Sequence, residues 1–399
     1  MKKTMSSEKI FMSKGETNDK YTMSFFDMKI SKVKNLILKR EASTKRMLFT
    51  QIEIGNSLAT RDEAISSDKK VYLEKKYISP LYIQVDNEFY PISEKSIKKL
   101  AMLNSCNSRN MLLATPNTLK GFLSDIIFNN EDNKKTKGKK LKKLSVITID
   151  NVVRGIVTEN YTEYPMSTLL EELIKALSQK KYKKFKFDGG HMSYEDIVLR
   201  FDVEIEKDVA QKYLGNKVNL EDEENIWKTG VRFRTSDTGY ASVSCESFMD
   251  LNGKILALEA DNRIFHRGSE DKDFAAYFKN VFNKANDQAA ALFATAEIPV
   301  EDAKKTIKEI LAADNEYFAK YTHFLGKKRK KALKEFVLLK TVEEENLTMF
   351  DIIMAIMDYQ DFISPDEQDD DNDEDINILK TKYELFCGSV LNKTWNREK

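Results

Sequence analysis

Three lysine-rich runs are the residues whose type and spacing most directly suggest a chemistry. They lie at Lys134–Lys143, Lys180–Lys186 and Lys327–Lys334. Clustered cationic side chains neutralise phosphates and release counterions, and aromatic rings among them can stack on nucleobases. Tyr182 and Phe185 interrupt the second run in this way. The runs therefore predict a nucleic-acid-binding surface. The alternative is a set of solvated loops in a lysine-rich protein.

A second candidate site is a pair of arginines on one predicted strand. Arg232 and Arg234 are two residues apart, so both side chains emerge on the same face of a strand. Two guanidinium groups on one face can grip a phosphate or a carboxylate through paired hydrogen bonds. His266 and Arg267 end the same region, and we expect them near this pair. The alternative is a solvent-facing strand followed by an ion-paired turn.

An acidic run at Asp366–Asp375 is the third feature. It lacks the glycine and the ligand spacing of a calcium-binding loop. Such a segment cannot pack into a core, and it is either a plain disordered loop or a loop that mimics nucleic acid or screens a basic groove.

Motifs of nucleophilic or metal-assisted catalysis are missing from the sequence. It has no nucleophile elbow, no G-x-G-x-x-G loop, no P-loop and no H-E-x-x-H pair. Cys106, Cys245 and Cys387 are far apart, and the three histidines are isolated. We therefore expect no metal, no cofactor and no catalytic residue. Because carboxylates are abundant, a hydrolase based on paired carboxylates stays open as an alternative.

Composition narrows the class of protein. The chain has 399 residues, 41% of them hydrophobic, which is enough to bury a core. Its net charge is only +1, so the clustering of charges carries the information rather than their sum. The N-terminal segment lacks the apolar stretch of a signal peptide, no run is long enough to span a membrane, and cysteine is sparse. These features predict a cytoplasmic protein with no membrane partner.

The elements that must position these residues indicate an α+β fold. We expect an antiparallel sheet meander with packed helices, followed by a mainly helical C-terminal region. The predicted organisation is a flexible N-terminal arm (1–45), a mixed region (46–143), a central sheet domain (144–269) and a helical region (270–399). The helical region contains an acidic loop at 364–375.

Local patterns define the central sheet most clearly. Apolar and polar residues alternate from Ile197 to Ile205, which is typical of a strand with one buried face. Hairpin turns are predicted at Asp150-Asn151 and at Asn252-Gly253. Thr168, with Glu171 three residues later, has the pattern of a capping box and predicts the start of a helix.

Four ordered motifs resemble a family of phage and plasmid proteins that is known only as a domain of unknown function. They are Arg154–Tyr161, Gly230–Gly239, Asp250–Gly253 and His266–Gly268, and the similarity extends over roughly residues 80–360. The chain departs from the family pattern at Asp250, where cysteine is usual, and at Thr235, where asparagine is usual.

The resemblance implies a role in phage or plasmid DNA replication, recombination or host takeover, in the cytoplasm of the host cell. The order of elements is also similar to that of phage single-strand annealing proteins such as RecT. That similarity implies a homo-oligomer with a basic groove beside a sheet, binding single-stranded DNA without catalysis. The alternative is a phage factor that inhibits or redirects a host defence protein. The residues expected to contact nucleic acid are Arg154, Lys180, Lys181, Tyr182, Lys183, Lys184, Arg232, Arg234, His266, Arg267, Lys327, Lys328 and Arg329.

Overall fold

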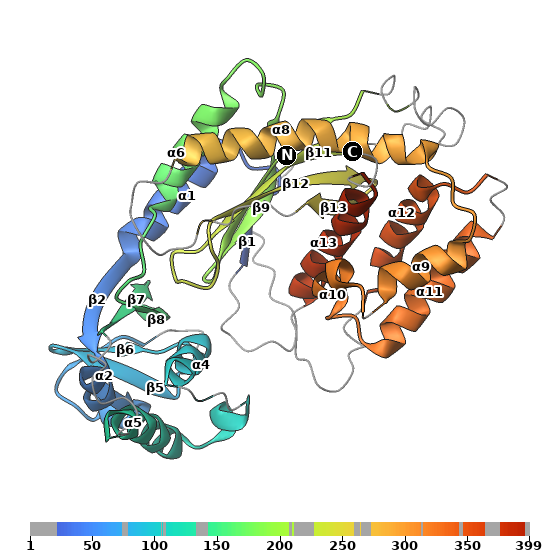
Figure 1. Cartoon of the computed structure of the whole chain (residues 1–399). Helices are drawn as coiled ribbons and strands as arrows, with labels where there is room; N and C mark the ends of the chain where they lie inside the picture. Colours follow the sequence, from blue (N-terminus) through green and yellow to red (C-terminus); the bar gives the residue numbers. More distant parts are fainter. Residues whose placement is uncertain are drawn as a thin grey trace, which may run out of the picture.

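A six-stranded sheet, two smaller sheets and a helical C-terminal region make up the chain, which confirms the α+β prediction (Figure 1). The computed structural model describes residues 22–73, 79–104, 106, 109–132, 143–206, 210, 227–258, 264, 273–312, 314–342, 346–363 and 376–395. Among these residues, no helix is both long and apolar enough to cross a membrane.

The six-stranded sheet is antiparallel throughout, in the order β1-β9-β10-β11-β12-β13. Its strands are β1 (Thr22–Ser24), β9 (Lys186–Ser193), β10 (Ile197–Glu204), β11 (Trp227–Thr235), β12 (Ser244–Leu251) and β13 (Lys254–Leu258). The predicted meander is confirmed. Its last turn is the expected two-residue turn, because Asn252 and Gly253 both have positive φ, at 56° and 84°.

One face of this sheet is buried under helices, as the alternation in β10 predicts. Leu199 and Phe201 are buried against α1 (Ile30–Ser43), α6 (Met166–Leu177) and α8 (Phe274–Ala294). Figure 1 shows α8 running along the sheet. Residues of the opposite parity, such as Arg200, point to the other face, which the helices leave open.

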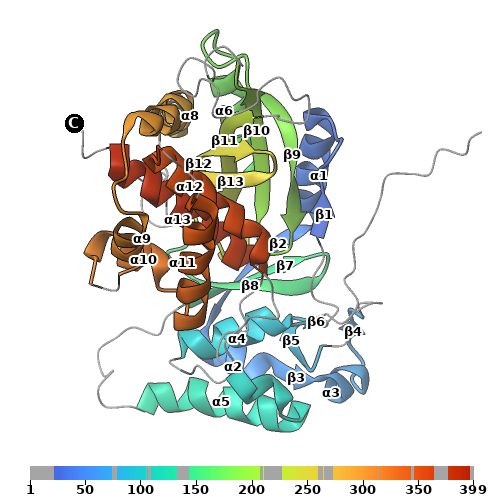
Figure 2. The ribbon, with the colours of Figure 1, turned by 90° about the vertical axis from the view of Figure 1, so that its right-hand side faces the viewer.

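An N-terminal lobe lies at one end of the sheet, and its two small sheets share one core with their helices. One sheet has the order β2-β7-β8 and the other β3-β5-β6-β4. Figure 2 shows β7 and β8 between the six-stranded sheet and helices α4 and α5. The elements are β2 (Thr44–Thr50), α2 (Gln51–Ser57), β3 (Leu58–Thr60), α3 (Arg61–Ile65), β4 (Lys70–Val71), β5 (Leu81–Val85), β6 (Glu88–Pro91), α4 (Glu94–Leu103), η1 (Arg109–Leu113), α5 (Pro116–Asp132), β7 (Lys143–Ile149) and β8 (Val152–Thr158).

The structure differs from the predicted ranges at both ends of this lobe. Residues 22–43, placed in a flexible arm, form β1 and α1, because β1 pairs with β9 and α1 buries Val33 and Ile37. The β7–β8 hairpin, placed in the central domain, belongs to the core of the N-terminal lobe. The Asp150-Asn151 turn itself is confirmed, since both residues have positive φ.

The predicted capping box at Thr168 is wrong. Helix α6 begins earlier, at Met166, and its N-cap residue is Pro165, which forms no side-chain cap. A carboxylate from another helix takes over this role, because Glu41 of α1 accepts a hydrogen bond of 2.8 Å from the Ser167 amide.

The C-terminal region is helical, as predicted, and packs against the far end of the sheet. Its elements are η4 (Thr295–Glu297), α9 (Ala303–Leu311), α10 (Glu316–Thr322), α11 (Lys327–Thr341), α12 (Met349–Asp358), η5 (Tyr359–Phe362) and α13 (Ile376–Trp395). Helix α13 lies so close to β13 that a Cβ atom on Gly388 would overlap the carbonyl oxygen of Ala257.

This contact predicts opposite effects for two glycine-to-alanine substitutions. Gly388→Ala should lower the free energy of unfolding by about 1–3 kcal/mol, because α13 must move away from β13. Gly121→Ala is the control, since that position is in α5 with no atom within 4 Å of the new Cβ. It should raise the free energy by about 0.4–1 kcal/mol. Urea unfolding measures both, and equal effects would contradict the close packing of α13.

Candidate ligand-binding groove

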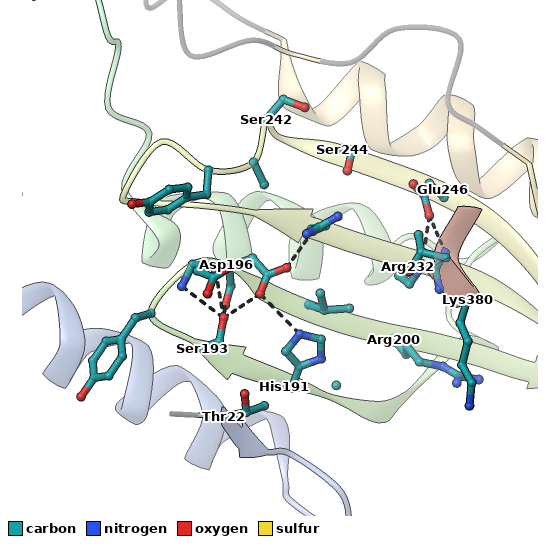
Figure 3. Close-up of a pocket in the computed structure, with 18 of the residues that line it drawn as sticks. Thr22, His191, Ser193, Asp196, Arg200, Arg232, Ser242, Ser244, Glu246 and Lys380 are labelled. Atoms are coloured by element: carbon teal, nitrogen blue, oxygen red, sulfur yellow. Dashed lines mark hydrogen bonds and ion pairs between the residues drawn. The ribbon is translucent and has the colours of Figure 1, made fainter. Parts of the chain in front are cut away.

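The open face of the six-stranded sheet forms the floor of a groove of about 1310 Å³. One wall comes from the N-terminal lobe, where Lys99 of α4 and Thr158 of β8 line it. Another wall is the first half of α13, from Lys380 to Leu385. Figure 3 shows the floor, with the labelled His191, Arg200 and Arg232 side chains on neighbouring strands and Lys380 on α13.

Strand register arranges the floor in rows. One row runs across five strands, and its members all line the groove: Ser24, His191, Val198, Arg234 and Ser244. The next row crosses four strands and contains Gly189, Arg200, Arg232 and Glu246. Residues opposite each other on neighbouring strands share a face, so the period-two alternation brings these charges together.

Every carboxylate that lines the groove has a cationic partner. The nitrogen–oxygen distances are 3.2 Å for Lys228–Asp188, 2.7 Å for Arg234–Asp196, 2.8 Å for Arg232–Glu246, 2.9 Å for Arg200–Asp250 and 2.5 Å for Arg232–Glu384, and Lys95 pairs with Glu195. The floor is therefore close to neutral.

Arg232 is enclosed by two of these carboxylates. Its Nε and Nη2 donate to Glu246 at 3.0 and 2.8 Å, and its Nη1 donates to Glu384 of α13. Burial opposes the charged form, but the two carboxylates outweigh it and raise the pKa of Arg232. The prediction that Arg232 and Arg234 share a face is confirmed. Arg232, however, joins the sheet to α13 instead of facing the groove with its donors.

Arg234 belongs to a more exposed cluster around Asp196. Arg234 Nε donates to Asp196 at 2.7 Å, His191 Nε2 lies 3.4 Å from the same carboxylate, and Ser193 donates to it at 2.8 Å. Burial favours the neutral acid, but these partners hold the pKa of Asp196 well below its usual range. The carboxylate therefore stays ionised and fixes the side chains of Arg234 and His191. Figure 3 shows Asp196 with its contacts to Ser193 and His191.

A buried carboxyl pair lies at the edge of the same floor. Asp202 is buried beside Asp188, with Lys228 Nζ at 3.6 Å from its carboxylate. Loss of solvation and the nearby negative charge of Asp188 raise the pKa of Asp202 to about 7. The pKa of Asp188 is lowered, because its hydrogen bond with Asp202 and the nearby Lys228 and Arg200 outweigh its own burial. Protonation of Asp202 is thus part of the native state at mildly acidic pH.

The walls of the groove differ from the floor in carrying positive charge that is unpaired among the described residues. Lys99 and Lys380 line the groove, and neither has an ion-pair partner in the part of the chain that the structure describes. Phe26, which follows β1, also lines the groove, and 73% of its surface is exposed. The groove therefore combines a neutral polar floor with cationic walls and an exposed aromatic ring.

The second lysine run lies away from the groove. Lys180, Lys181, Lys183 and Lys184 are exposed between α6 and β9, beside α8 on the helix-covered face of the sheet. Lys181 donates to Asn283 of α8 at 2.7 Å. Tyr182 is buried and packs on Phe282, so its ring belongs to the core.

The remaining predicted residues are also dispersed. Lys327, Lys328 and Arg329 begin α11 in the helical region and do not line the groove. Arg154 is buried in β8, with its guanidinium 3.8 Å above the ring of Tyr194, which does line the groove. His266, Arg267, most of the run at 134–143 and the acidic run lie outside the described residues.

Of the predicted nucleic-acid contacts, Arg232 and Arg234 line the groove, and the residues beside Arg234 were not predicted. His191 follows two glycines that suggest a turn, yet both glycines belong to β9, with φ of 128° and 140°. Lys99 and Lys380 do not stand out in a chain that contains 65 lysines and arginines. His191 is placed in the groove by the register of β9 against β10, in which Gly190 pairs with Leu199. This register cannot be read from the sequence near His191.

Residues of three of the four ordered sequence motifs, including Asp250 of the third, line the groove, and the fourth motif, His266–Gly268, lies outside the described residues. Thr158 and Tyr161 come from the first motif, and Arg234 and Gly239 come from the second. Within the described ranges, no group of three histidine, cysteine or acidic side chains is arranged to hold a metal ion. No family model, curated protein or solved structure matches the chain.

The enclosed Arg232 predicts a large loss of stability when it is removed. Arg232→Met should lower the free energy of unfolding by about 3–5 kcal/mol, because Glu246 and Glu384 lose their shared cation in a buried site. Arg234→Met is the matched control on the same strand. It should cost less than about 1 kcal/mol, because this arginine is partly exposed. Chemical unfolding compares them, and similar losses would show that Arg232 is not the main link.

Asp202 predicts a pH dependence of stability. Between about pH 4 and pH 7 the folded protein keeps a proton on Asp202 that the unfolded chain has released. The contribution of this group to the free energy of unfolding is therefore lost as pH rises through about 7. Asp202→Asn should flatten the decline from pH 5 to pH 8, while Glu204→Gln, at the exposed end of β10, should leave it unchanged. Urea unfolding at each pH tests this, and an unaltered slope in Asp202→Asn would be the contrary result.

Proposed function

We propose that the groove binds single-stranded nucleic acid without cleaving it, in a phage or plasmid DNA transaction such as recombination or annealing. The observation that carries this proposal is the charge balance. All groove carboxylates are ion-paired, whereas Lys99 and Lys380, on different walls, have no such partner among the described residues. A phosphate backbone is attracted by the two lysines and meets no unpaired carboxylate on the floor.

A single strand suits this groove better than a duplex. The floor carries polar side chains in rows across neighbouring strands, which offers successive hydrogen-bonding groups to an extended chain laid across the sheet. Phe26 offers an exposed ring to a base, and a base must be unpaired to stack on it. The lysine runs add no support, because the two that the structure describes lie away from the groove.

Charge reversal on the walls tests the proposal. The double variant Lys99→Glu/Lys380→Glu should weaken binding of a fluorescein-labelled oligothymidylate at least about tenfold. The slope of the logarithm of the binding constant against the logarithm of the salt concentration should become less steep by about 0.7 per lost phosphate contact. Lys98→Glu/Lys331→Glu is the control, since both lysines are exposed outside the groove. Fluorescence anisotropy between 50 and 200 mM salt gives both quantities. Absence of binding at low salt, or equal losses in both double variants, would overturn the proposal.

A protein partner is the second candidate, and exposed apolar side chains on the neighbouring elements α11 and η5 favour it. Leu339 and Val342, at the end of α11, are 74% and 73% exposed, and Phe362 of η5 is 52% exposed. Patches of large apolar side chains are frequent at protein interfaces. A nuclease-treated host lysate distinguishes the two functions, because a partner bridged by nucleic acid is lost after treatment. Retention of a partner by the native chain but not by Leu339→Glu would support an interaction factor.

A further inference from the structure

The row that contains His191 and Arg234 has the features of a site for one anionic group. His191, Val198 and Arg234 stand side by side on β9, β10 and β11, and hydroxyl groups of Ser24 and Ser244 end the row. About 40% of both the His191 and the Arg234 side chain is exposed, and both line the groove. A phosphate above Val198 therefore has a donor on either side.

Asp196 orients the side chains of both Arg234 and His191. It binds Arg234 through Nε only, and the two terminal nitrogens of Arg234 have no hydrogen-bond partner among the described residues. It contacts His191 through Nε2, and Nδ1 of that ring is likewise unengaged within those residues. Ser193 holds Asp196 in place, because its hydroxyl accepts from the Glu195 and Asp196 amides while donating to the carboxylate. The donors are thus fixed before a ligand arrives.

The charge of this cluster depends on His191. Arg234 and Asp196 cancel each other, so the cluster has no net charge when the imidazole is neutral and a charge of about +1 when it is protonated. Ser24 on β1 and Val198 on β10 bring no titratable group to the ring. The other charged groups nearby are Arg200, Arg232 and Glu246 in the next row, Asp188 beside that row in β9 and Glu195 in the turn, and each has its own ion-pair partner.

We propose that His191 and Arg234 form a phosphate subsite within the groove, and that protonation of His191 switches it to tight binding. This inference rests on the proposed function and names the part of the groove that holds one phosphate of the nucleic-acid backbone. Guanidinium groups bind phosphate through two parallel hydrogen bonds, and the two terminal nitrogens of Arg234 supply such a pair. Protonated His191 adds an opposing cation.

Oligothymidylate binding at two pH values tests the subsite. The native chain should bind about tenfold more tightly at pH 5.5 than at pH 8.0, because one cation is added next to a phosphate in a partly enclosed groove. His191→Gln should reduce this ratio to less than about twofold. Arg234→Gln should weaken binding at both pH values. Because one phosphate contact is lost, the slope of the logarithm of the binding constant against the logarithm of the salt concentration should become less steep by about 0.7.

Two control variants separate His191 from other groups that titrate. His323→Gln removes an exposed histidine of the helical region, and Asp202→Asn removes the carboxyl whose pKa is raised to about 7. Both should keep the pH ratio of the native chain. A ratio that persists in His191→Gln, while Lys99→Glu/Lys380→Glu still abolishes binding, would overturn the subsite and leave the proposed function standing.

If the native chain binds no oligonucleotide at either pH, the proposed function fails and tripolyphosphate tests the subsite by itself. The three histidines give separate ring signals in NMR spectra, and His191→Gln identifies the signal of His191. Tripolyphosphate should shift this signal at pH 5.5 in the native chain and not in Arg234→Gln. An unshifted signal would overturn the subsite.

Discussion

The interaction on which the groove depends is the enclosure of Arg232 by Glu246 and Glu384. Glu246 belongs to the neighbouring strand, but Glu384 comes from α13, at the far end of the sequence. This ion pair links the floor to one wall, and the close approach of Gly388 to β13 holds the same helix in place. A buried guanidinium with two carboxylates tolerates little displacement, because any movement leaves a charge without its partner. The wall that carries Lys380 is therefore fixed relative to the floor.

Ion pairing also determines what the groove can bind. A sheet face with many carboxylates would repel a polyanion if they were unpaired. Here the pairs make the floor neutral, and the remaining positive charge lies on the walls and, at lower pH, at His191. Charge of this kind attracts a phosphate backbone without reading its sequence, because base edges are not required for the contact. The proposed function therefore implies binding of single strands without sequence preference.

Local signals in the sequence were sufficient for much of the fold and for little of the groove. The alternation through Ile197–Ile205 and the positive-φ pairs Asp150-Asn151 and Asn252-Gly253 act over a few residues, so a strand of the large sheet and two hairpin turns could be predicted. The partner of each charge depends on strand register and on helix docking, which no local pattern records. Glu41 capping α6 and Glu384 reaching Arg232 are both contacts between residues more than 100 positions apart. The lysine runs were conspicuous because of their composition, not because of their location.

Photo-crosslinking tests most directly whether the groove is where nucleic acid binds. An oligonucleotide that contains 5-iodouracil forms covalent adducts with nearby aromatic and electron-rich side chains on irradiation, and mass spectrometry of the digested protein locates them. The account predicts adducts on groove residues, foremost Phe26, Tyr161 and Tyr240, and their loss in Lys99→Glu/Lys380→Glu. Adducts confined to the lysine runs around Tyr182 or at the start of α11 would contradict it.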